Sequence, residues 1–183
     1  LRLTSCKERN AGGKNASFFF LIPPRKTNRP HRNLRVQFAR YFQGINIHGR
    51  PESLEVLNER AGPPLVFYSN HQSWWDGFFL FRLGRTYGLD LRVMMEEKNL
   101  RRYPFFRLTG AFGVNPGSPA GRGASLLHAI RYLRKPGKQR RALIIFPHGR
   151  LLPPWTDPWP PFKPGLETLL RLCPQARPVP VVH

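Results

Sequence analysis

Short apolar runs alternate with longer segments of helical periodicity along most of the chain. Unbroken apolar runs, which predict buried strands, occur at 65–68, 91–95, 142–146 and 179–182. Apolar residues at helical spacing predict helices at 74–83, 124–133 and 164–172, with a helical turn at 105–108. Strands without polar alternation are typical of parallel sheets that helices cover on both faces. We therefore predict the α/β class: a layered α/β/α domain with a largely parallel or mixed central sheet.

The N-terminal part of the chain follows this pattern less clearly. Residues 1–33 are basic and polar and are interrupted by paired glycines and paired prolines, which favours a mobile leader. Helical spacing starts near residue 34, so we assign 34–183 to one domain. Within it we expect a short strand at 45–48 and a short helix from Pro51, since proline suits the first helical turn. The chain ends inside its last apolar run, and we expect the domain to continue beyond it.

Ligands of open α/β sheets bind beyond the carboxyl ends of the strands, and the loop after 65–68 carries His71 and Asp76. A carboxylate bonded to one imidazole nitrogen fixes the tautomer, so the other nitrogen can take a proton from a hydroxyl. Residues five apart lie on different faces of a helix, so the pair requires His71 in the loop and Asp76 in the first helical turn. A polar turn that caps a helix is the alternative interpretation.

A second loop, at 146–150, follows the strand at 142–146. Gly149 permits a tight turn with exposed backbone N–H groups, and Arg150 offers a cation to an anionic ligand. An ordinary strand-to-loop turn explains the same residues.

Two further segments are rich in glycine or proline. The stretch 117–123, with Arg122, fits either an anion-binding nest or a flexible connection. The stretch 153–164 is dense in proline and carries Trp155 and Trp159, so we predict an irregular surface loop.

Composition adds a strong charge. The 183 residues include 30 Lys+Arg against 10 Asp+Glu, a formal net charge of +20. Such an excess points to an anionic partner, either nucleic acid, an acidic membrane surface or a phosphorylated substrate, although codon usage alone also raises arginine content. The two cysteines form no Cys-x-x-Cys pair, which excludes a zinc ribbon. No run of about 18 apolar residues predicts a membrane-spanning helix.

Several segments occur in a fixed order within about residues 48–183. They are Asn70-His71-Gln72-Ser73-Trp74-Trp75-Asp76-Gly77, Lys98-Asn99-Leu100, Tyr103-Pro104-Phe105-Phe106, Gly110-Ala111-Phe112-Gly113-Val114, Phe146-Pro147-His148-Gly149, Phe162-Lys163-Pro164-Gly165 and Val179-Pro180-Val181-Val182. Their order and spacing resemble those of the glycerolipid acyltransferases, the lysophosphatidate acyltransferase superfamily. The first segment matches that family's Asn-His-x-Ser-x-x-Asp-Gly block.

The resemblance implies transfer of a fatty acyl group from a thioester, acyl-CoA or acyl carrier protein, to a lipid hydroxyl. The expected acceptor is lysophosphatidate, in phospholipid synthesis. His71 is then the general base and Asp76 orients it, while a backbone N–H at the helix start or at Gly149 holds the oxyanion. The resemblance also implies substrate binding by Asn70, Ser73, Phe146, Pro147, His148, Gly149 and Arg150. No metal and no cofactor is expected besides the acyl donor, which is a co-substrate.

Two departures from the family pattern concern the acceptor. The second block usually ends in arginine, where this chain has Pro116, and the third block has His148 in place of its glutamate. The family uses these positions to hold the acceptor phosphate. Arg150, displaced by one position from the usual arginine, is the candidate replacement cation. The alternative acceptor is a non-phosphorylated lipid alcohol or a glycolipid.

The protein is expected to bind peripherally at the cytoplasmic face of an anionic membrane. Phe18–Ile22, Trp155 and Trp159 are candidate interfacial anchors, unless the tryptophans pack beneath their own loop. A non-catalytic basic protein that binds lipid or nucleic acid is a further alternative. A nucleic-acid partner is not expected, because no recognised nucleic-acid-binding motif is present.

Overall fold

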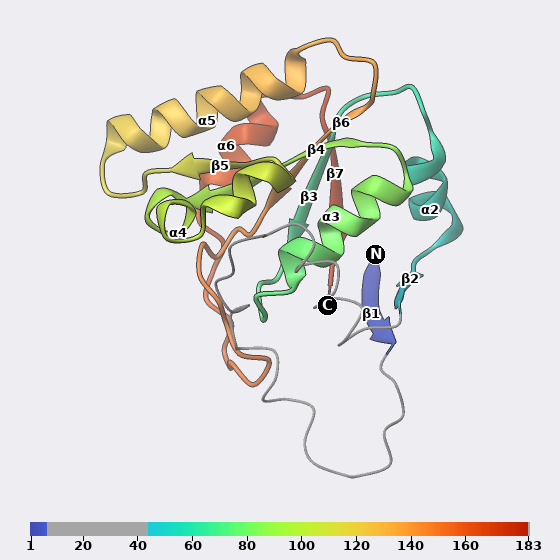
Figure 1. Ribbon diagram of the computed structural model, residues 1–183, viewed down its shortest axis with the longest axis horizontal. Helices are drawn as coiled ribbons and strands as arrows, with labels where there is room; N and C mark the ends of the chain where they lie inside the picture. Colours follow the sequence, from blue (N-terminus) through green and yellow to red (C-terminus); the bar gives the residue numbers. More distant parts are fainter. Residues whose placement is uncertain (7–43, 183) are drawn as a thin grey trace.

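The computed structural model describes residues 1–6 and 44–182, and its centre is a five-stranded sheet (Figure 1). The strands are β3 (Leu65–Ser69), β4 (Asp90–Glu96), β5 (Ala111–Val114), β6 (Arg141–Ile145) and β7 (Arg177–Val181). Their order is β5-β4-β6-β3-β7, and every neighbouring pair is parallel. The predicted α/β class with a parallel central sheet is confirmed.

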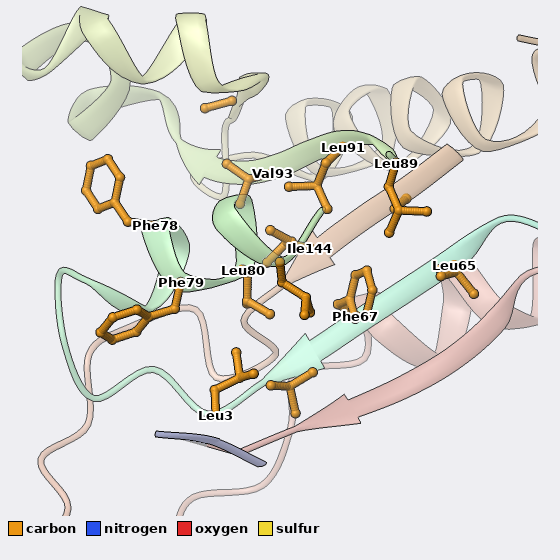
Figure 2. Close-up of a cluster of buried hydrophobic side chains, with 14 of the residues drawn as sticks. Leu3, Leu65, Phe67, Phe78, Phe79, Leu80, Leu89, Leu91, Val93 and Ile144 are labelled. Carbon is orange, nitrogen blue, oxygen red and sulfur yellow. The ribbon is translucent and has the colours of Figure 1, made fainter. Parts of the chain in front are cut away.

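Helices cover both faces of this sheet. They are α2 (Pro51–Asn58), α3 (Asp76–Thr86), α4 (Glu97–Arg102), the 3₁₀ helix η2 (Pro104–Thr109), α5 (Pro119–Arg134) and α6 (Gly165–Leu172). Leu65 and Phe67 of β3 enter a hydrophobic cluster with α2, α3, α4 and η2, part of which Figure 2 shows. Val66, between them, faces the opposite cluster with α5 and α6. This alternation buries β3 on both faces, which explains why its sequence is an unbroken apolar run.

The order of the strands determines where the two candidate loops meet. β6 lies between β4 and β3, so β3 and β6, the two strands that precede the candidate loops, are direct neighbours. Tyr68 of β3 is level with Ile145 of β6 in the parallel register. The loops that follow these strands therefore start side by side at the same edge of the sheet.

A two-stranded antiparallel ribbon adjoins the sheet. It consists of β1 (Arg2–Cys6) and β2 (Gly44–His48), of which β2 was predicted and β1 was not. The Leu3 N–H donates to the carbonyl of Val182 (2.8 Å), and the Leu3 side chain is buried in the first cluster. The first residues of the chain therefore pack on the domain. The remainder of the predicted 1–33 leader and the helical pattern from residue 34 lie outside the described residues.

The elements predicted from 51 onward are present, with two additions and one correction. β5 and α4 were not predicted. The stretch 117–123 is not a flexible connection, because α5 begins within it. The anion-nest interpretation of this stretch stays a prediction. Ser118 caps this helix by accepting a hydrogen bond from the Gly121 N–H at 3.0 Å, and Pro119 occupies the first helical turn. The predicted irregular loop at 153–164 is confirmed.

Candidate active site

His71 and Asp76 lie in hydrogen-bond contact after β3. His71 is in the loop, and Asp76 is the first residue of α3, as the pairing requires. The Nδ1 of His71 is 3.0 Å from Oδ2 of Asp76. The Asp76 side chain is only 1% exposed, whereas that of His71 is 24% exposed. The carboxylate is thus fixed in the interior while part of the imidazole faces solvent.

Three donors converge on one carboxylate oxygen. Oδ2 of Asp76 also accepts the backbone N–H groups of Gln72 (2.7 Å) and Ser73 (2.8 Å). Asp76 therefore both caps the turn and orients the imidazole, so the His–Asp pair and the polar capping turn are both present. An ionised carboxylate only accepts, so the hydrogen of a neutral His71 ring resides on Nδ1. Nε2 is then the ring nitrogen that can accept a proton.

The second loop packs directly against this pair. The ring of Phe146 stacks on the imidazole of His71, with centroids 4.0 Å apart and planes inclined by 19°. The Leu152 N–H donates to the carbonyl of His71 at 2.7 Å. These contacts fix the loop and the ring of His71 relative to one another. They join two segments more than seventy residues apart in sequence, as the neighbouring strands β3 and β6 require.

Residues 146–149 form a tight turn. Gly149 adopts a left-handed φ of +67°, and its N–H donates to the carbonyl of Phe146 at 2.9 Å. This N–H is used within the turn, and its role in holding the oxyanion stays a prediction. The N–H groups of Gln72 and Ser73 at the helix start are likewise directed at Asp76.

The structure places the other predicted residues in different surroundings. Ser73 is buried, and its hydroxyl accepts the Trp75 N–H at 3.0 Å, which is a structural role within the turn. Asn70 is half-buried beside Ser69, whose hydroxyl donates to the Asn70 side chain at 3.4 Å. Pro147 is buried, while Arg150 is exposed. Of these residues, Arg150 is the one most accessible to a ligand.

His148 is enclosed by aromatic rings. It is 5% exposed, and its Nδ1 has no hydrogen-bond partner among the described residues. The centroids of Trp159 and Phe162 lie 5.3 and 4.9 Å from that of its ring. The loop at 153–164 thus folds back onto the turn at 146–149.

Lys163, from the segment Phe162-Lys163-Pro164-Gly165, also adjoins this turn. Its N–H donates to the carbonyl of Pro147 at 3.0 Å. A Cβ placed on Gly149 would lie 2.7 Å from Nζ of Lys163 and 3.3 Å from its Cε. The Lys163 side chain therefore extends across Gly149. The signal in the sequence was the Phe-Lys-x-Gly segment.

Two cavities among the described residues lie away from this site. Cavities of about 320 and 400 Å³ lie at the amino ends of β4 and β6, at the opposite edge of the sheet from His71. No three His, Cys, Asp or Glu side chains in residues 1–6 and 44–182 form a metal-binding group. None of the helices in these ranges has the length and apolarity needed to cross a membrane.

A known protein family matches most of the chain, residues 45–183. A family model described as Acyltransferase matches this range, which contains both loops of the candidate site. No curated protein and no solved structure matches the chain significantly.

Proposed function

Because the chain belongs to the acyltransferase family, which includes lysophosphatidate acyltransferases, we propose that it transfers a fatty acyl group from a thioester to the hydroxyl of lysophosphatidate. Family membership itself establishes an acyltransferase that acts on lipid in general. The observation that carries the catalytic part of this proposal is the His71–Asp76 pair, in which a partly exposed imidazole lies 3.0 Å from a buried carboxylate.

His71 acts as general base in this proposal. Its Nε2 takes the proton of the acceptor hydroxyl while the hydroxyl oxygen attacks the thioester carbonyl. The tetrahedral intermediate then expels the thiolate, which takes the proton from the imidazolium, so the thiol and the new ester are the products. Asp76 stabilises the imidazolium between these steps. A positioned general base contributes about 10²–10⁴-fold in rate.

We further propose that the enzyme binds peripherally to the cytoplasmic face of an anionic membrane. Trp155 and Phe162 in the loop at 153–164 are 69% and 52% exposed. Aromatic side chains suit the headgroup boundary, and each Lys or Arg near an anionic surface adds about 1 kcal/mol of attraction. Since this loop contacts His148, membrane binding there brings lipid close to the catalytic pair. Of the other candidate anchors, Phe18–Ile22 lies outside the described residues, and Trp159 packs against His148 while 37% of it stays exposed.

Turnover of the full chain with defined substrates tests the proposal. Palmitoyl-CoA and palmitoyl-acyl carrier protein are compared as donors, and lysophosphatidate and monoacylglycerol as acceptors, with released thiol and esterified lipid both quantified. We expect equal amounts of the two products and a preference for lysophosphatidate. A preference for monoacylglycerol would favour the acceptor without phosphate, and no ester with any pair would contradict the proposal.

A further inference from the structure

Two cations border the turn at 146–149, and nothing in the described structure neutralises them. Lys163 extends across Gly149, and Arg150 follows directly in the chain. Among residues 1–6 and 44–182, neither side chain has a carboxylate oxygen within 4.0 Å. A cation that borders a catalytic loop without an internal counter-ion is free to bind an anionic part of the substrate.

Lys163 is the better positioned of the two. Its backbone N–H is tied to Pro147, and the next residue but one begins α6. The neighbouring ring of Phe162 packs against His148. These contacts fix the backbone from which the Lys163 side chain extends, so ordering of this loop adds less to the entropy lost on binding.

The identity of residue 149 fits this placement. A side chain there would meet Nζ of Lys163 at 2.7 Å, and the left-handed φ of +67° disfavours any residue other than glycine. Glycine thus provides both the turn and the space that the lysine occupies.

The turn also links Lys163 to the reacting centre. Gly149 is hydrogen-bonded to Phe146, and Phe146 stacks on His71. In lysophosphatidate, one methylene and one ester oxygen separate the carbon of the reacting hydroxyl from the phosphorus. A cation for this phosphate must therefore lie near the general base, and Lys163 reaches the turn whose Phe146 stacks on His71.

We propose that Lys163 binds the phosphate of the acceptor and replaces the arginine of the second family block, a position where this chain has Pro116. This inference rests on the proposed function, and it assigns specificity for a phosphate monoester to a residue on a different loop. Lys163 presents a point charge rather than the planar fork of an arginine, so its contact with phosphate is not bidentate. One charge-assisted hydrogen bond to phosphate corresponds to about a tenfold to hundredfold change in affinity.

The test compares Lys163→Gln, Lys163→Arg and the control Lys138→Gln, an exposed lysine at the opposite edge of the sheet. Binding of glycerol 3-phosphate and of glycerol is measured by tryptophan fluorescence, because Trp159 contacts His148 in this region. The values of kcat/KM for lysophosphatidate and monoacylglycerol are measured in parallel. We expect Lys163→Gln to weaken glycerol 3-phosphate binding and kcat/KM for lysophosphatidate at least about tenfold. Monoacylglycerol turnover should not change, and Lys163→Arg should keep most of the preference.

Three results would overturn the inference. They are an equal loss for both acceptors in Lys163→Gln, the same selective loss in Lys138→Gln, or a selective loss in Arg150→Gln with none in Lys163→Gln. The binding arm separates this inference from the proposed function. Binding of glycerol 3-phosphate that depends on Lys163, without turnover of lysophosphatidate, supports the phosphate site and contradicts the function.

Discussion

Replacing Asp76 by asparagine should remove the charge of the catalytic pair but keep its hydrogen bonds. His71 Nδ1 and the N–H groups of Gln72 and Ser73 all meet the single atom Oδ2, at 3.0, 2.7 and 2.8 Å. An amide oxygen at this position accepts the same three bonds, whereas an amide NH₂ there would face three donors. We therefore expect the asparagine oxygen to occupy this position and the His71 hydrogen to stay on Nδ1.

The expected loss of activity follows from the charge alone. A hydrogen bond to a charged group is worth about 1.5–3 kcal/mol and a neutral one about 0.5–1.5 kcal/mol, so the imidazolium loses roughly 1–1.5 kcal/mol of stabilisation. The 1% exposure of Asp76 increases this loss, because a buried charge is screened less than an exposed one. We expect kcat to fall about 10- to 100-fold. Asp76→Ala should also lose about 2–6 kcal/mol of unfolding free energy, since the N–H groups of Gln72 and Ser73 lose their acceptor.

Two measurements check this prediction. Steady-state kcat is compared for wild type, Asp76→Asn and His71→Ala, and ¹⁵N–¹H correlation spectra of the imidazole report which ring nitrogen carries the hydrogen. Activity in Asp76→Asn that is as low as in His71→Ala, or a ring hydrogen on Nε2, would refute the argument from the shared oxygen.

Three further substitutions probe the surroundings of the pair. Phe146→Ala removes a ring whose stacking on His71 is worth about 0.5–1.5 kcal/mol. We expect kcat to fall about 3- to 10-fold with the acceptor KM unchanged, and Phe146→Tyr, the control, to restore activity. A change in KM alone would contradict this role of the ring. His148→Phe removes a buried nitrogen that has no hydrogen-bond partner among the described residues. Urea denaturation should therefore show an unfolding free energy that is unchanged or up to about 1 kcal/mol higher, and a clear decrease would show that the nitrogen is bonded. Arg140→Met removes the donor of three backbone carbonyls, those of Val56, Glu59 and Pro63. The free energy of unfolding in urea should fall by about 3 kcal/mol. A fall below about 1 kcal/mol would show that these carbonyls do not depend on Arg140.

The parts of the fold that the sequence predicted are those with a strong local pattern. Leu65–Phe67 is buried on both faces, so its strand is an unbroken apolar run. β5 escaped prediction because it is a four-residue edge strand that contains Gly113, and α4 because it buries only Leu100. β1 depends on pairing with a strand some forty residues away, which no local pattern encodes. The start of α5 was predictable from the cap at Ser118, but the glycines of 117–123 obscured it.

The part of the candidate site that was predictable consists of residues close together in the sequence. The spacing of His71 and Asp76 after an apolar strand indicated the pair and the condition under which it forms. The stacking of Phe146 and the position of Lys163 arise from the neighbourhood of β3 and β6 and from a loop that folds back. The engagement of the Gly149 N–H depends on the form of the turn, which glycine permits but does not specify.

Acyl transfer by purified His71→Ala decides whether His71 is the general base. Thiol release and esterified lipid are measured for wild type, for His71→Ala and for the matched control His128→Ala, an exposed histidine on α5. We expect His71→Ala to lose at least about 100-fold in kcat while its melting temperature stays close to that of wild type, and His128→Ala to remain active. Turnover near the wild-type level in folded His71→Ala would contradict the assignment of His71 as the general base.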